Sequence, residues 1–170
     1  MSAITEMSGL DAKLQSDLVD LLRDAVHDGA SVGFILPVSD TELHRYWQRV
    51  ATEIADGEKH LLVRTEDGVI VGAVQMSLCT KPNGMHRAEI QKLLVHSRCR
   101  RKGYGQDLMT AVEQLAIRLG RSLLVLDTEA GSPAQALYAQ QGYQLLGVLP
   151  GYAASPAGGL KPCAFLYREL

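Results

Sequence analysis

The sequence predicts an α/β fold in which one mixed β-sheet is flanked by helices. The first observation is a change of hydrophobic period, because helical spacing over residues 10–54 gives way to strand-like runs over residues 60–95. The second is the alternation of helices and strands over residues 103–168. The third is that no linker or repeat divides the chain, so we expect a single domain over residues 1–170.

The N-terminal part predicts two amphipathic helices. Apolar residues recur at helical spacing over residues 10–25. In the second helix, Ser39 and Glu42 fit a capping box, and the apolar residues that follow recur at helical spacing until Gly57 ends the pattern.

The remaining elements follow from period and turn chemistry. Strand-like runs at 60–65 and 69–78 flank Glu66-Asp67-Gly68, which is a strong hairpin signal. Residues 81–84 have loop composition, and a glycine or proline borders each of the predicted helices that follow. The other expected elements are a strand at 88–95, a helix at 103–119, a strand at 122–127, a helix from Ser132-Pro133 to Gln141, and strands at 143–148 and 163–168 with a Gly/Pro-rich loop between them.

Composition and charge exclude several classes of protein. The chain has 46% hydrophobic and 21% charged residues, which disfavours disordered and fibrous proteins. The net charge of −2 gives no overall positive field for nucleic acid or an anionic membrane. The longest apolar run, within Val32–Val38, is too short to span a bilayer, and the N-terminus lacks the features of a secretion signal. We therefore expect a soluble cytoplasmic protein.

The cysteines and histidines predict no metal site. The three cysteines include no C-x-x-C pair, and the five histidines include no H-x-x-x-H pair. We expect reduced thiols that pack as small apolar groups. Cys79 and Cys99 also lack an accompanying motif that would position a histidine and an acid, so nucleophilic thiol chemistry is disfavoured.

The segment 95–106 predicts a phosphate-binding site. It connects a strand to a helix, four of the five residues Arg98–Lys102 are basic, and Gly103 and Gly105 follow at alternate positions. A helix N-terminus attracts anions, and glycines let the backbone approach them closely. A Walker A loop is excluded because no Lys-Ser/Thr follows, and a dinucleotide fingerprint is excluded because Leu108 stands in place of the third glycine.

This segment resembles the acetyl-CoA signature of the GNAT family of N-acetyltransferases. The matching residues are Arg100-x-x-Gly103-x-Gly105, preceded by Leu93-Leu94-Val95, and the downstream Tyr138 and Gly142-Tyr143 strengthen the match. The predicted element order also resembles that family over nearly the whole chain. The resemblance implies a GNAT-like mixed central sheet with splayed parallel strands.

The resemblance implies acetyl-CoA as cosubstrate. The family holds the pyrophosphate on the loop after the splayed strand and pairs the pantetheine arm with the backbone of that strand. The matching residues of the loop are Arg100, Arg101, Lys102, Gly103, Tyr104, Gly105 and Gln106, and those of the strand are Leu93, Leu94 and Val95.

Segments outside this loop resemble a family member that acetylates an amino-acid-like toxin. The resemblance implies a small amine acceptor, toxin-like or lysine-like, with a peptide or protein N-terminus as the alternative. Two alternatives to an enzyme are a non-catalytic acyl-CoA-binding module and a nucleic-acid-binding protein, of which the net charge of −2 disfavours the second. A homodimer is possible, as in many relatives. The resembling segments are Gly29–Phe34, Lys81–Gly84, Arg87–Glu89, Leu126–Ser132 and Leu149–Tyr152.

Two carboxylates are candidates for deprotonating the acceptor amine, whose pKa of about 10.4 keeps it protonated at neutral pH. Glu89 lies on the strand before the cofactor loop, and Asp127 lies at the carboxyl end of the next strand. Either could instead bind the ammonium; Glu89 could pair with Arg87 or Lys92, and Asp127 could accept a turn hydrogen bond. Glu129 is a weaker third candidate.

The resemblance supplies the remaining catalytic roles. Tyr138 matches the tyrosine that the family uses as general acid toward the departing thiolate. A backbone N–H near Leu94 could stabilise the oxyanion. Phe34, Tyr46 and Trp47 could line the acceptor pocket, although the helical spacing of Tyr46 and Trp47 makes core packing the default for these two.

Overall fold

A seven-stranded mixed sheet organises the fold. The structure is a computed structural model that describes residues 2–170, and its strand order is β1-β2-β3-β4-β5-β7-β6. Every neighbouring pair of strands is antiparallel except β4 and β5, which are parallel. The strands are β1 (Ser2–Met7), β2 (Lys59–Glu66), β3 (Val69–Leu78), β4 (Arg87–Val95), β5 (Leu123–Glu129), β6 (Gln144–Ala154) and β7 (Leu160–Glu169).

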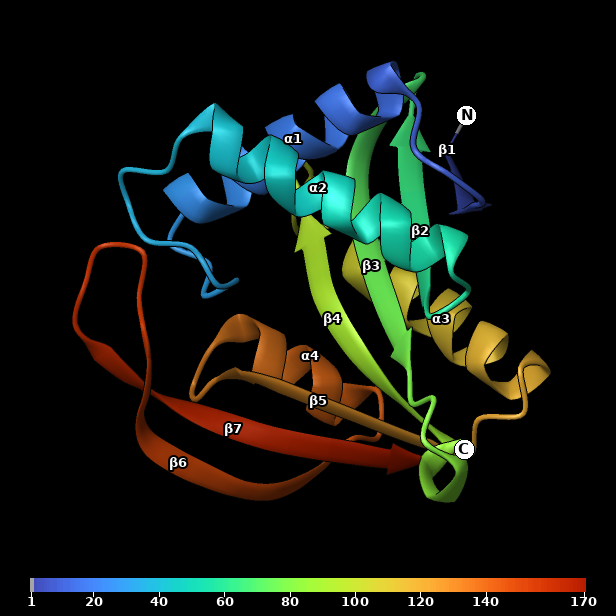
Figure 1. Ribbon diagram of the computed structural model, residues 1–170. Coiled ribbons are helices and arrows are strands. Elements are labelled where there is room, and N and C mark those ends of the chain that lie inside the picture. Colours follow the sequence, from blue (N-terminus) through green and yellow to red (C-terminus); the bar gives the residue numbers. More distant parts are fainter. Residues whose placement is uncertain (1) are drawn as a thin grey trace.

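Helices cover both faces of the sheet (Figure 1). α1 and α2 pack on one face, and α3 and α4 pack on the other. The helices are α1 (Ala12–His27), α2 (Asp40–Ala55), α3 (Tyr104–Arg118) and α4 (Pro133–Gln140), with short 3-10 turns at Pro82–Gly84 and Ser97–Cys99. Within residues 2–170, no helix combines the length and hydropathy that crossing a bilayer requires.

The alternation of side chains along the strands divides the core in two. In β2, Leu61 and Val63 face α1 and α2, whereas Leu62 faces α3. The first of these cores contains the fully buried Trp47 of α2, and the second is built around Leu108 and neighbouring residues of α3. The mixed α/β sheet flanked by helices is confirmed.

The parallel strands β4 and β5 pair over a short length only. Arg87, Ala88 and Glu89 of β4 pair with residues 123–125 of β5, and beyond this point the two strands separate (Figure 1). The rest of β4 is paired with β3 alone, so its other backbone edge faces the gap. The prediction of splayed parallel strands is thus confirmed.

A β-bulge interrupts β4 just after the strands separate. Gln91 pairs with Gln75 and Leu94 with Ala73, so two residues of β4, Lys92 and Leu93, lie opposite one residue of β3. Lys92 adopts φ 49°, a left-handed conformation that is costly for a residue with a side chain. The bulge reverses which residues of β4 face α3.

The structure differs from the sequence prediction at both ends of the sheet. The prediction began with two helices and missed β1, because Ile4 and Met7 are its only half-buried apolar side chains and its pairing with β2 is long-range. The region predicted as a Gly/Pro-rich loop is mostly strand, since β6 and β7 extend to a hairpin near Ser155. β6 tolerates Pro150 because it is an edge strand with an irregular register there.

The capping box of α2 is confirmed and predicts a stability effect. Ser39 Oγ accepts a hydrogen bond from the Glu42 N–H at 3.2 Å, and the Glu42 carboxylate accepts one from the Ser39 N–H at 2.9 Å. We expect Ser39→Ala to lower the free energy of unfolding by about 0.5–2 kcal/mol, measured by urea denaturation. Ser16→Ala, at an exposed position within α1, is the control; an equal effect of both substitutions would contradict the prediction.

Candidate active site

A cleft of about 1380 Å³ opens where β4 and β5 separate. Its walls come from the α1–α2 connection, α2, the free edge of β4, the end of β5, the start of α3, and α4. Pockets for drug-sized ligands have about 300–1,000 Å³. This cleft can therefore hold one long ligand together with a second, smaller one.

The cleft brings together almost all of the predicted site residues. Lys102 is the exception, because it lies outside the lining and its Nζ is 3.3 Å from Glu66 Oε1. The predicted residues that line the cleft are Glu89, Asp127, Tyr138, Leu93, Leu94, Val95, Arg100, Arg101, Gly103, Tyr104, Gly105 and Gln106.

The aromatic residues considered for the acceptor pocket divide differently. Tyr46 lines the cleft, whereas Trp47 is fully buried in the core and Phe34 packs edge-on against Tyr46 with ring centroids 5.6 Å apart. Core packing of Trp47 is therefore confirmed, whereas the alternative that Phe34 lines the cleft is wrong. Their helical and loop positions turn them toward α1 and the sheet, where apolar area is buried most completely.

The connection between β4 and α3, residues 96–103, is here called the basic loop, and α1 holds its first half. Asp24 of α1 accepts hydrogen bonds from the Ser97 N–H and the Ser97 hydroxyl, both at 2.7 Å. Asp28, at the end of α1, forms an ion pair with Arg100. Two carboxylates thus fix the path of the chain as it leaves β4.

The β2–β3 hairpin holds the second half of the basic loop. Glu66 accepts hydrogen bonds from the Tyr104 hydroxyl at 2.6 Å and from the Lys102 ammonium at 3.3 Å. These two hydrogen bonds hold the pKa of Glu66 below its ordinary value. Arg64 stacks on the Tyr104 ring, with its Cζ 3.8 Å from the ring centroid, and pairs with Asp107 at 2.6 Å.

These ion pairs leave one cation of the loop available at the cleft. Arg100 and Lys102 are paired with acidic residues, whereas Arg101 lines the cleft and forms no ion pair within residues 2–170. Gly103, at φ 80°, precedes α3 and offers no side-chain cap to its first N–H groups. Gly105 must remain small, because a Cβ there would lie 3.1 Å from Leu137 Cδ2. Arg101 and the unpaired N–H groups together suit a phosphate.

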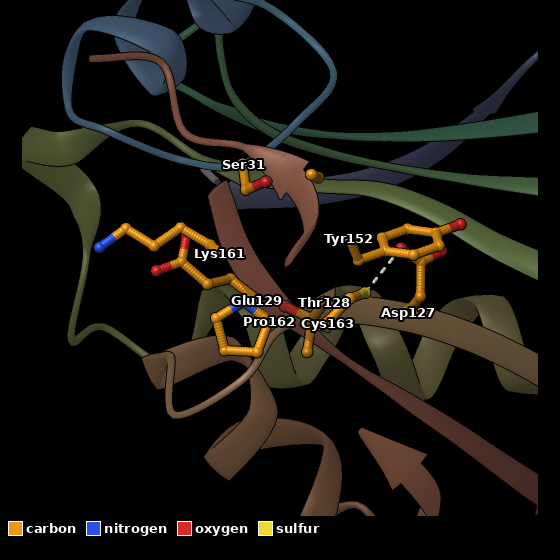
Figure 2. A pocket seen from close by; sticks show the side chains of 9 residues that line it. Ser31, Asp127, Thr128, Glu129, Tyr152, Lys161, Pro162 and Cys163 are labelled. Carbon is orange, nitrogen blue, oxygen red and sulfur yellow. Dashed lines mark hydrogen bonds between the residues drawn. The ribbon is translucent and has the colours of Figure 1, made fainter. Parts of the chain in front are cut away.

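The two candidate carboxylates occupy the other end of the cleft. Glu89 is half-buried at the last position where β4 pairs with β5, and in the described chain neither Arg87 nor Lys92 forms an ion pair with it. Asp127 is exposed beyond the paired segment and accepts a hydrogen bond from the Cys163 thiol at 3.3 Å (Figure 2). Asp127 does not cap α4, because Ser132 does.

A small pocket of about 30 Å³ continues the cleft beside Asp127 (Figure 2). Ser31 of the α1–α2 connection, Tyr152 of β6 and Lys161 of β7 contribute to its wall. The sequence analysis assigned no role to Tyr152 and Lys161 because it treated the β6–β7 hairpin as a loop, and it assigned none to Ser31 individually. Tyr152 reaches Asp127 because β6 pairs with β7 and β7 pairs with β5, and no local pattern signals this arrangement.

Burial determines the protonation of two groups in the cleft wall. It raises the pKa of Tyr138 well above the ordinary value, with a smaller contribution from the charge of Asp127. Tyr138 is therefore protonated at neutral pH and can donate a proton. Burial and the hydrogen bond to Asp127 also raise the pKa of Cys163 to about 11, so that its thiol is not a nucleophile at neutral pH. Within residues 2–170, no three His, Cys, Asp or Glu side chains are grouped to hold a metal ion.

The clamp on the basic loop predicts an acid-sensitive local stability. Because the folded pKa of Glu66 is lowered, its contribution is complete above the unfolded pKa of about 4.3 and is lost as the pH falls through the folded pKa. We expect Glu66→Gln to reduce hydrogen-exchange protection in residues 96–103 by about two- to fivefold at pH 7. The wild type should approach the variant only in acid. Glu58→Gln, at an exposed position, is the control, and equal protection in both variants at pH 7 would contradict the assignment.

Comparison with known proteins agrees with this geometry. The model of the acetyltransferase (GNAT) family matches residues 19–143. A ribosomal-protein-alanine N-acetyltransferase from Brucella melitensis has a TM-score of 0.80 at 22% identity, with 99% of each chain covered. A protein described as a candidate phosphinothricin N-acetyltransferase has a TM-score of 0.77 at 21% identity, again with 99% of each chain covered.

A third similar structure was solved with acetyl-CoA. It is yncA from Salmonella typhimurium, described as a candidate acetyltransferase, with a TM-score of 0.74 at 18% identity over 99% of this chain and 94% of that one. At these identities the similar structures share the fold, and the family match covers well over half of the chain. With the splayed strands and the glycine-bordered basic loop, these findings show that the chain belongs to the GNAT family and is an acetyl-CoA-dependent N-acetyltransferase.

Proposed function

We propose that this enzyme transfers the acetyl group directly from acetyl-CoA to the amine of a small, amino-acid-like acceptor. The observation that carries the proposal is the cleft between β4 and β5, which has a phosphate-suited end at the basic loop and a carboxylate-lined end at Glu89 and Asp127. A long cosubstrate can enter from the first end and an ammonium group from the second. Tyr138 lines the same cleft.

The residues at the first end fit acetyl-CoA. Its pyrophosphate would meet Arg101 and the N–H groups that follow Gly103. Its pantetheine amides would pair with the edge of Leu93–Val95, which β5 leaves free. Asp24 and Glu66 already fix the basic loop, so the loop loses little further conformational freedom when acetyl-CoA binds.

The reaction requires that one group of the chain accept a proton and that another donate one. Glu89 or Asp127 accepts a proton from the acceptor ammonium, directly or through water, and frees the nitrogen lone pair. The nitrogen forms a bond to the thioester carbonyl carbon, the carbon–sulfur bond breaks, and the nitrogen releases a second proton to solvent as the neutral amide forms. Tyr138 gives its proton to the departing thiolate and regains one from solvent. Tyr138 is protonated at neutral pH, so the donor is loaded before the thiolate forms.

The acceptor class rests on sequence resemblance. The segments from Gly29 to Phe34 and from Leu126 to Ser132 resemble tabtoxin resistance protein, which supports a tabtoxin-like or lysine-like acceptor. Both segments border the carboxylate end of the cleft. One similar structure is described as a ribosomal-protein-alanine N-acetyltransferase and another as a candidate phosphinothricin N-acetyltransferase. The shared fold is therefore compatible with protein and small-molecule acceptors alike. A peptide N-terminus is therefore the competing acceptor.

The transfer is tested by free-CoA release with lysine, other amino acids, polyamines, a tabtoxin-like β-lactam and an alanine peptide as separate acceptors. We expect turnover with an amino-acid-like amine, and we expect Tyr138→Phe to lower kcat by about 10²–10⁴-fold while acetyl-CoA affinity is retained. Tyr167→Phe, which also removes one hydroxyl but lies outside the cleft lining, is the control. Turnover of the peptide alone would overturn the acceptor class, and a fully active Tyr138→Phe would overturn the acid role.

A second pair of variants separates the carboxylates. We expect the substitution that removes the base, either Glu89→Gln or Asp127→Asn, to lower kcat by about 10²–10⁴-fold with little change in the KM for the amine. Loss of the other carboxylate should raise that KM and leave kcat nearly unchanged. Steady-state kinetics with the amine as the varied substrate distinguish the two roles. If neither variant lowers kcat, neither group is the base.

A further inference from the structure

The bulge in β4 delivers a lysine to the acceptor end of the cleft. Before the bulge, Ala88 and Ile90 face α3, so regular alternation would place Lys92 in the same core. After it, Leu94 faces α1 and α2 instead. Lys92, in its left-handed conformation, lies on the α2 side and lines the cleft.

The Lys92 ammonium is half-buried without a matching anion. Its Nζ lies 5.5 Å from the centroid of the Tyr46 ring and close to Gly33, where a Cβ would approach it to 3.8 Å. No carboxylate among residues 2–170 lies within ion-pair distance of it. Lys59, another lysine of the same cleft, pairs with Glu53 at 2.5 Å. Burial, with a smaller contribution from the charge of Lys59, lowers the pKa of Lys92, and the carboxylates of Asp127 and Glu89, which lie beyond ion-pair distance, oppose this shift.

Tyr46 gathers a second cation beside Lys92. Arg49 lies over the same ring, with its Cζ 5.6 Å from the centroid, and it also lines the cleft. The ring is held in place because its hydroxyl donates a hydrogen bond to Gln75 Oε1 at 3.0 Å. The acceptor end therefore carries Lys92 and Arg49 in addition to the carboxylates of Glu89 and Asp127.

Acetyl-CoA does not supply the anion that Lys92 lacks. Its phosphates belong at the basic loop, which begins only after β4 ends, and its pantetheine arm carries no negative charge. An acceptor carboxylate would give Lys92 the close anionic partner that neither the described chain nor acetyl-CoA supplies. A molecule with both a carboxylate and an ammonium group matches the opposite charges of this end of the cleft.

We propose that Lys92, assisted by Arg49, forms a subsite for the carboxylate of the acceptor, and that the acceptor is a free amino acid. This inference rests on the proposed acetyl transfer for the identity of the site, and it adds the group that orients the acceptor. The ammonium of the amino acid then faces Glu89 and Asp127. A peptide N-terminus or a polyamine lacks the carboxylate beside its amine and loses this contact.

The test compares amino acids with matched amines that lack the carboxylate. Each proteinogenic L-amino acid is assayed for acetylation against its amide, and lysine also against cadaverine. We expect the best amino acid to exceed its amide by about 10- to 100-fold in kcat/KM, as for loss of a hydrogen bond to a charged group. Lys92→Met should remove this preference, Lys92→Arg should restore part of it, and Lys81→Met, which changes an exposed lysine outside the cleft, should keep it.

Calorimetric binding to the CoA-saturated protein separates the two proposals. If no acceptor is acetylated but an amino acid binds better than its amide, and Lys92→Met removes that difference, the subsite stands and the acetyl transfer fails. If amines or peptides are acetylated without any preference for the carboxylate, the transfer stands and the subsite is wrong. The subsite is also overturned if no amino acid binds better than its amide, or if Lys92→Met weakens both compounds equally.

Discussion

The short parallel pairing of β4 with β5 is the constraint on which the rest of the structure depends. Three residues on each strand hold the two halves of the sheet together, after which the strands diverge. A sheet that continued to pair would bury the backbone edge of β4 and leave no cleft. The divergence instead exposes that edge between two cores that are each complete on their own face of the sheet. The cleft therefore has rigid walls although a sheet is interrupted at its base.

The bulge at Lys92 lies just beyond the point where β4 and β5 diverge. The ladder between β3 and β4 resumes at Ala73 and Leu94, so the pairing on both sides of the bulge offsets its left-handed backbone. One extra residue changes the side to which the following side chains point. Leu94 thereby completes the core under α1 and α2, while Leu93 and Val95 pack toward α3. The same shift is what brings a charged side chain into the cleft and not into the core.

The basic residues of the basic loop have two roles that composition alone does not separate, namely fixing the loop to the rest of the fold and providing a cation to the cleft. Arg100 and Lys102 are used within the fold, since Asp28 and Glu66 fix them to α1 and to the β2–β3 hairpin. Among the basic residues of this loop, only Arg101 both lines the cleft and forms no ion pair in the described chain. Isolated surface pairs contribute little to global stability, so their main effect is to order the loop locally. An ordered loop presents the first N–H groups of α3 in a fixed direction.

The sequence by itself determined the helices, the order of the central strands along the chain and the position of the basic loop, because periodicity, caps and glycines act over a few residues. It also named Glu89, Asp127 and Tyr138, which the fold places on one cleft. Tertiary structure alone decided that β1 exists, that Tyr152 reaches the acceptor end, and which cations are already paired. Each of these features depends on contacts between residues distant in the chain, and such contacts leave no periodic signal in the local sequence. Lys92 belongs to the same class, since its place follows from the register of β3 against β4.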